Sequence, residues 1–213
     1  MSQRFVYAVD NFYANPDAVR RRALSMPFTE PEDYTGWRTR PYFQTGVRRR
    51  IESALRLPLR HWSEADDERN YNRGHGVFYF GLTRGSRAEV AGVHYDSPAH
   101  WVTMIVYLTP DAPADAGTSL WQHRATGLSA APTARDAARL KRPVQELGEI
   151  LERDTRRRNR WRELDRIGNV YNRAVFYRSG VLHSATRHFG GDVRDGRLYQ
   201  TFRFAVARPA EAR

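Results

Sequence analysis

Two histidines and one aspartate carry the most chemical information in this sequence. His94 and Asp96 stand two residues apart within the segment 92–98, and His183 follows much later in the chain. Residues two apart on a β-strand point to the same face, and a histidine from a distant strand can complete a three-residue site. Two imidazoles and one carboxylate that leave further coordination positions open form the ligand set of non-haem Fe(II) oxygenases. The alternative is that these are two unrelated histidines and an ordinary surface aspartate, because a bare His-x-Asp is common by chance.

The composition limits the kinds of site and protein that are possible. The chain has no cysteine, so it has no disulfide, no thiolate metal site and no cysteine nucleophile, and any metal must be held by His, Asp or Glu. Its 213 residues, 40% hydrophobic and 12% aromatic, predict one folded domain over residues 1–213. No apolar run reaches the roughly 18 residues of a membrane span, and the N-terminus lacks the apolar stretch of a secretion signal. We therefore expect a cytoplasmic protein without a membrane association.

The chain is strongly basic, and its basic residues are almost all arginine. It contains 35 Lys plus Arg against 24 Asp plus Glu, a formal charge of +11, and Lys141 is the single lysine. Arginine recognises carboxylate or phosphate with two parallel hydrogen bonds, so the substrate, a small molecule or a peptide, could be anionic. The codon usage of a GC-rich genome would give the same preference for arginine. The arginine runs 20–22, 48–50 and 156–158 fall in expected helices, where charge runs are usually solvated, and we do not expect nucleic-acid binding. The oligomeric state stays unknown.

The distribution of apolar residues predicts a helical N-terminal part followed by a β-rich part. Within residues 1–75, Asn15 can cap a helix whose first turn holds Pro16, and a second helix is expected over 45–57. From residue 76 to 206, short segments rich in Val, Ile, Tyr, Phe and Trp alternate with turn residues. These expected strands are 77–82, 91–96, 101–108, 117–123, 173–178, 180–185 and 197–206. This spacing is typical of an antiparallel jelly roll, so the predicted fold class is mainly β with flanking helices around a cupin-like double-stranded β-helix.

One stretch interrupts the β pattern of residues 76–206. Residues 133–167 have helical spacing and many charges, with Pro143 as a break. They contain too few apolar residues for a core of their own, so we expect a mostly helical insertion between two core strands rather than a separate domain. Such an insertion could act as a lid over the metal.

The sequence around the three candidate ligands resembles a known enzyme family. Gly92-Val-His-Tyr-Asp-Ser-Pro, Trp101-Val-Thr-Met-Ile-Val-Tyr-Leu-Thr, the isolated His183 and Gly196-Arg-Leu-Tyr-Gln-Thr-Phe-Arg-Phe are similar to the core of 2-oxoglutarate- and Fe(II)-dependent dioxygenases. The similarity is greatest to uncharacterised bacterial members of the prolyl-hydroxylase-like branch, and it covers about residues 76–206. It implies that His94, Asp96 and His183 are the iron ligands and the catalytic centre. It further implies that Arg197 grips the far carboxylate of 2-oxoglutarate, with Tyr107 beside the same carboxylate.

The physical chemistry of a buried dicarboxylate supports an arginine in that role. A carboxylate inside a barrel is costly unless it meets a hydrogen-bonded cation, and a guanidinium offers a planar fork for it. Arg203 shares strand parity with Arg197 and is the second candidate, while Arg187 and Arg194 are nearer to His183 in the sequence. The cofactors expected are Fe(II), the co-substrate 2-oxoglutarate and O2.

The resulting functional prediction is a dioxygenase that hydroxylates an unactivated C–H bond of an amino-acid-like, peptidyl or small natural-product substrate. Desaturation and ring closure remain open, because substrate placement decides between them. The alternatives are a nucleic-acid dealkylase of the same superfamily, a non-enzymatic cupin-like binding protein and a metal-dependent isomerase. Among the other histidines, His123 could contact substrate or make a structural hydrogen bond. Surface positions are expected for His61, His75, His100 and His188.

Overall fold

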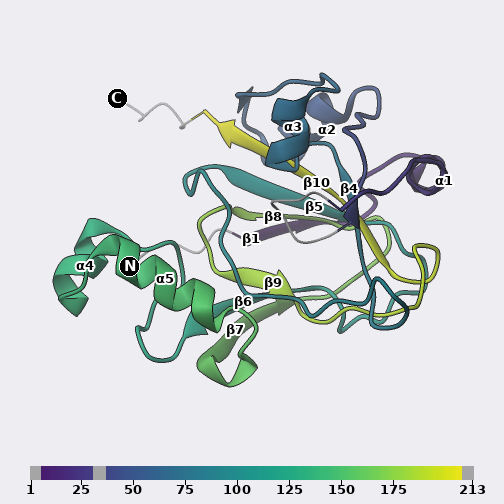
Figure 1. The fold of residues 1–213 in the computed structure, drawn as a ribbon. Coiled ribbons are helices and arrows are strands. Elements are labelled where there is room, and N and C mark those ends of the chain that lie inside the picture. The colour runs from purple at the N-terminus through teal and green to yellow at the C-terminus, as the bar shows by residue number, and fades with distance from the viewer. Residues whose placement is uncertain (1–5, 31–36, 208–213) are drawn as a thin grey trace.

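Two antiparallel β-sheets dominate the computed structural model, which describes residues 6–30 and 37–207 (Figure 1). The larger sheet has the strand order β1 (Val6–Val9), β8 (Ala174–Arg178), β5 (Val102–Tyr107), β10 (Arg197–Val206), β4 (Phe78–Gly81) and β2 (Trp37–Arg38), and β3 (Leu59–Arg60) also pairs with β10. The smaller sheet has the order β7 (Trp161–Ile167), β6 (Thr118–His123) and β9 (His183–Ala185). The predicted fold class, mainly β with flanking helices, is confirmed at this level.

Side-chain alternation along β10 gives the large sheet one apolar and one polar face. Leu198, Phe202 and Phe204 lie in the core cluster that also holds residues of α1 (Pro16–Ser25) and α2 (Val47–Leu55). The residues between them belong to the opposite face and line a cavity; they are Arg197, Tyr199, Thr201 and Arg203. This period of two is why β10 could be predicted with its observed bounds. Helices α2 and α3 (Glu68–Arg73) lie on one side of the large sheet and the small sheet lies on the other (Figure 1).

The small sheet is held between two apolar layers. On the side facing the large sheet, Leu120 of β6 packs with Ile105 and Tyr177. On the other side, Leu147 and Leu151 of α5 (Val144–Asp154) pack against tryptophans of β6 and β7. Apolar side chains therefore fill part of the space between the two sheets. The rest of this space is the cavity that the polar residues of β10 line.

The expected helical insertion 133–167 is helical only up to Arg160. It contains α4 (Ala134–Leu140), α5 and the short 3-10 helix η1 (Arg158–Arg160), and then β7 pairs with β6. The prediction was wrong for 161–167 because of a β-bulge: the register shifts between Leu120 and Trp121, so β7 carries one extra residue there. Because of the bulge, the apolar residues Trp161, Leu164 and Ile167 follow one another at intervals of three, a spacing that is also typical of a helix.

Two further expectations differ from the observed elements. Residues 91–96 do not form a strand, because the backbone N–H groups of Val93, His94 and Asp96 each donate to a different segment. The expected helical flank 1–75 also contains β1, β2 and β3, and β1 pairs with β8 along the sheet edge. Both predicted helices are present, and the Asn15 side chain accepts from the backbone of Ala18 as expected of a cap. Within the described ranges, no helix is long and apolar enough to cross a membrane.

Candidate metal centre

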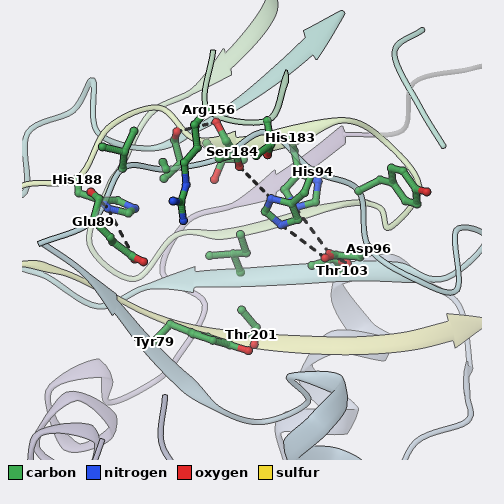
Figure 2. Close-up of a pocket in the computed structure, with 18 of the residues that line it drawn as sticks. Tyr79, Glu89, His94, Asp96, Thr103, Arg156, His183, Ser184, His188 and Thr201 are labelled. Carbon is green, nitrogen blue, oxygen red and sulfur yellow. Dashed lines mark hydrogen bonds and ion pairs between the residues drawn. The ribbon is translucent and has the colours of Figure 1, made fainter. Parts of the chain in front are cut away.

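His94, Asp96 and His183 come together as one three-residue group (Figure 2). One potential ligand atom from each residue lies within 4.8 Å of the others. The Nε2 atoms of His94 and His183 are each 3.7 Å from a carboxylate oxygen of Asp96. Asp96 and His183 are buried, whereas the side chain of His94 is 46% exposed. The site therefore has two buried ligands and one at the cavity mouth.

Hydrogen bonds fix the ring orientation of both imidazoles. Nδ1 of His94 lies 3.0 Å from the carbonyl oxygen of Gly92, and Nδ1 of His183 lies 2.9 Å from that of Val181. A carbonyl only accepts, so each Nδ1 carries the proton and each Nε2 presents its lone pair towards Asp96. This is the arrangement that outer hydrogen bonds give to metal-binding histidines. Burial, together with His94, lowers the pKa of His183 to about 4, which keeps its imidazole neutral near pH 7.

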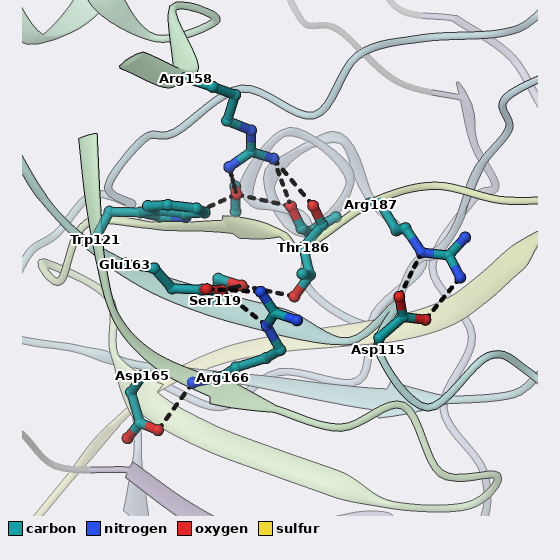
Figure 3. A network of polar contacts seen from close by, with 11 residues as sticks. Asp115, Ser119, Trp121, Arg158, Glu163, Asp165, Arg166, Thr186 and Arg187 are labelled. Atoms are coloured by element: carbon teal, nitrogen blue, oxygen red, sulfur yellow. Dashed lines mark hydrogen bonds and ion pairs between the residues drawn. The ribbon is translucent and has the colours of Figure 1, made fainter. Parts of the chain in front are cut away.

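Backbone pairing places the two histidines beside each other. The N–H of His94 donates to the carbonyl of His183 at 3.0 Å, and the reverse bond is 2.8 Å. β9, which begins at His183, pairs with β6. Arg158 covers this strand from outside: it stacks over Trp121 and donates to the carbonyl oxygens of residues 185 and 186 (Figure 3). The distant His183 is thus fixed to the irregular segment that carries the other two ligands.

The carboxylate of Asp96 is held by two donors. Thr103 donates to one oxygen at 2.8 Å, and Arg203 forms an ion pair with the other at 2.6 Å. Burial alone would raise the pKa of Asp96, but the charge of Arg203, helped by the two histidines and Thr103, outweighs it and lowers this pKa to about 2. Asp96 is therefore ionised at neutral pH, and each oxygen retains a lone pair for a cation.

Arg203 consequently occupies a different place from the one considered for it as the second candidate for binding 2-oxoglutarate. Its guanidinium forms the ion pair with Asp96, and its backbone N–H donates to Nδ1 of His75 at 3.0 Å. The expectation that His75 lies on the surface is wrong, since this residue is 2% exposed beneath β10.

Arg197 lies at the other end of the inner face of β10. It is 2% exposed, and it donates to the carbonyl oxygens of Ala116 and Gly117, each at 3.2 Å. Its guanidinium also lies 4.4 Å from the ring centroid of Tyr199. No carboxylate of the described residues lies within ion-pair distance of it, so Arg197 is a buried cation without a counter-ion. Such a charge is costly unless an anion joins it.

Tyr107 contacts Arg197 but does not line the cavity. The Arg197 guanidinium lies 5.4 Å from the Tyr107 ring centroid, and the Tyr107 hydroxyl forms a 2.7 Å hydrogen bond with Thr118. Thr118 in turn accepts a longer bond, 3.4 Å, from Arg197. Tyr107 therefore packs against Arg197 without facing the cavity itself.

The triad and Arg197 face the same cavity, whose volume is about 780 Å³. Sequence reasoning missed most polar residues of its lining, among them Thr103, Glu89, Arg156 and His188. His188 was expected on the surface, which is wrong: it is 7% exposed, between Glu89 and β4. Alternate residues of β5 face the cavity, and this spacing could have indicated Thr103. Glu89, Arg156 and His188 lie outside the strands, where no such spacing applies. His123 lies elsewhere, fully buried and bonded to Asp154 at 3.1 Å, so the structural alternative holds for it.

The chain is similar to solved structures of known proteins. Among solved structures, the chain is similar to the non-heme alpha ketoglutarate dependent epimerase SnoN from nogalamycin biosynthesis, with a TM-score of 0.53 and 16% identity over 98% of this chain and 83% of that chain. It is also similar to HygX from Streptomyces hygroscopicus, solved with nickel and 2-oxoglutarate bound (TM-score 0.49, 10% identity, 98% and 85% covered), and to a Pseudomonas putida prolyl-4-hydroxylase (0.44, 13%, 98% and 95%). The likeness to SnoN shows a common fold.

The sequence also matches a family model. The chain belongs to DUF6445, a family of unknown function, whose model matches residues 1–204. No curated protein matches the sequence significantly. The membership in the prolyl-hydroxylase-like branch stays a prediction.

Proposed function

We propose that this protein is an Fe(II)- and 2-oxoglutarate-dependent dioxygenase that hydroxylates an amino-acid-like, peptidyl or small natural-product substrate. His94, Asp96 and His183 would hold the iron, and Arg197 would bind the far carboxylate of 2-oxoglutarate. In this proposal the two facing sheets are a double-stranded β-helix, and the fold shared with SnoN supports that assignment. O2 is the second co-substrate.

The observation that carries the proposal is the buried charge of Arg197. A guanidinium that is 2% exposed, has no acidic partner among the described residues and lies on the cavity of the triad fits a bound anion. A metal site alone would not need it. 2-Oxoglutarate supplies both a metal-chelating end and a second carboxylate, so one molecule would satisfy the triad and Arg197 together.

The donor groups of the triad fit a divalent iron. The two imidazoles aim Nε2 inward and Asp96 is ionised, so the site offers one carboxylate and two ring nitrogens to a cation. Three ligands on one side leave the remaining positions for a chelating 2-oxo acid and a gas molecule.

The protein's own residues prepare the reaction. When bound, iron with 2-oxoglutarate and O2 supplies an oxidant strong enough for an unactivated C–H bond, and succinate and carbon dioxide are released. Thr103 and Arg203 hold Asp96 in its ionised form, and Arg197 orients 2-oxoglutarate from the far end. The inter-sheet side chains Ile105 and Tyr177 exclude water on one side of the triad.

An anaerobic titration of the metal-free protein with Fe(II) and 2-oxoglutarate tests the proposal. Chelation of iron by a 2-oxo acid produces a visible charge-transfer band, which we expect in the wild type. His183→Ala should abolish the band, and Arg197→Met should raise the 2-oxoglutarate concentration it requires by at least tenfold. Arg187→Met, at an exposed pair with Asp115, is the matched control and should titrate like the wild type. A wild-type protein without the band would favour an isomerase or a non-enzymatic barrel.

A further inference from the structure

Five charged side chains line the cavity without a role in holding the metal or 2-oxoglutarate: Glu89, Glu152, Arg153, Arg156 and Arg157. Of these, Arg153 and Arg157 each lie 3.5 Å from Asp154. Glu89 and Arg156 both line it, and Figure 2 shows them on its walls, with the Arg156 side chain extending between the Glu89–His188 side and the triad. They form no direct ion pair, but the positive charge of Arg156 is close enough to act on Glu89 and lower its pKa. The gap between them is part of the cavity.

Glu89 is a partly buried carboxylate that makes no direct ion pair with an arginine or lysine of the described residues. Its carboxylate accepts no hydrogen bond from the described residues, and Nδ1 of His188 lies 3.8 Å from it. Burial lowers the pKa of His188 to about 4, so this ring is neutral near pH 7. Burial raises the pKa of Glu89, and the positive charges of Arg156 and Arg197 act against this rise.

The backbone around Glu89 is fixed rather than free. Its N–H donates to the carbonyl of Leu82 at 3.1 Å, and its carbonyl accepts from His188 at 3.1 Å. His188 packs on Gly81, where an added Cβ would come within 2.6 Å of the ring, so glycine is what lets the imidazole lie there. The carboxylate is thus positioned by β4 and its neighbouring loop.

Arg156 stands on the opposite wall, just after α5. The preceding residue, Thr155, accepts from the N–H of Val93 at 2.9 Å and donates its hydroxyl to the Val93 carbonyl. Gly92 permits this close approach, because a Cβ there would lie 2.9 Å from the Thr155 hydroxyl. Arg156 itself has no ion pair among the described residues, whereas its neighbour Arg157 lies 3.5 Å from Asp154. Arg156 is exposed, so its guanidinium is accessible both to solvent and to a molecule in the cavity.

From these two opposite charges on different walls of one cavity we infer that the site binds a small zwitterion, a free amino acid, with its carboxylate on Arg156 and its ammonium on Glu89. A dianion would be repelled by Glu89, and a simple amine would leave Arg156 without a partner. The cavity volume of about 780 Å³ is large enough for such a molecule beside 2-oxoglutarate. That this zwitterion is oxidised rests on the proposed dioxygenase function, but its binding does not.

Calorimetric titration of the full chain with the twenty proteinogenic L-amino acids, each also as its N-acetyl and carboxamide derivative, tests the inference. The titrations are run with Mn(II), a redox-inert metal, and 2-oxoglutarate, and again without both. We expect at least one free amino acid to bind, and its two blocked derivatives to bind at least tenfold more weakly.

Two variants locate the charges. Glu89→Gln should weaken binding of the free amino acid at least tenfold and abolish the discrimination against its N-acetyl form. Arg156→Gln should do the same for the carboxamide form. Glu146→Gln and Arg142→Gln make the same charge changes in an exposed i,i+4 pair of the α5 region, and both should bind like the wild type.

The outcomes separate this inference from the proposed function. Absence of binding by every free amino acid, equal binding of a blocked derivative, or wild-type affinity in both cavity variants would overturn the zwitterion site. Amino-acid binding in a protein that shows no charge-transfer band with Fe(II) and 2-oxoglutarate would support the zwitterion site and refute the dioxygenase.

Discussion

Replacing Arg203 by methionine tests the electrostatics of the triad most directly. Arg203 forms a 2.6 Å ion pair with Asp96, whose side chain is only 3% exposed. Methionine keeps much of the length and apolar stem of arginine and removes its charge. In the metal-free protein, the variant leaves the Asp96 carboxylate buried with only Thr103 and the imidazoles of His94 and His183 around it.

The size of the effect follows from the pKa of Asp96. Its fall from 3.8 to about 2 corresponds to roughly 2 kcal/mol of net stabilisation of the folded state. This stabilisation is complete above pH 3.8 and is lost as the pH falls towards 2, because the folded pKa lies below the unfolded one. Since burial opposes this shift, Arg203 contributes more than the net value. Loss of one partner of a buried pair costs about 3–5 kcal/mol, and we expect a destabilisation of that size at pH 7.

A divalent cation between the ligands would replace the missing charge. Urea unfolding at pH 7 should therefore show Arg203→Met strongly destabilised without metal, and Mn(II) should raise its unfolding free energy by more than it raises that of the wild type. Arg187→Met, which removes an exposed arginine of the same length, should leave both unfolding curves unchanged. An Arg203→Met protein within 1 kcal/mol of the wild type, or one with an equal gain from Mn(II), would refute the reasoning.

Three further perturbations have defined outcomes. Burial lowers the pKa of His75 to about 4, so its contribution is complete above pH 6.5 and about 3 kcal/mol is lost as the pH falls from 6.5 to 4; urea unfolding across this range should be less pH-dependent in His75→Gln. Gly92→Ala should cost about 1–3 kcal/mol in urea unfolding because its Cβ would lie 2.9 Å from the Thr155 hydroxyl, and a wild-type unfolding curve would contradict this contact. Thr103→Val removes the hydroxyl donor to Asp96 and should weaken Mn(II) binding about tenfold in an EPR titration; unchanged affinity would show that the bond does not orient the ligand.

The sequence predicted those parts of the fold and site that depend on local periodicity. β10 was predicted with its observed bounds because alternate residues face an apolar core and a polar cavity. The His94–Asp96 spacing also predicted two ligands on one side, although the segment is not a strand and a single bridge to His183 orients it. β7 was missed because its bulge imitates a helical period, and His188 was misplaced because its burial depends on Gly81, more than a hundred residues earlier.

The arginine run 156–158 shows why local pattern cannot assign roles to charged residues after a helix ends. A run of like charge on a helix is usually a solvated face, but these residues follow α5 and point in different directions. Arg156 and Arg157 both line the cavity, but Arg157 also lies 3.5 Å from Asp154, and Arg158 stacks 4.6 Å from the Trp121 ring centroid. The first therefore contacts what enters the cavity, while the last supports the sheet that carries His183. A salt dependence of amino-acid binding that disappears in Arg156→Gln but persists in Arg158→Gln would separate these roles by experiment.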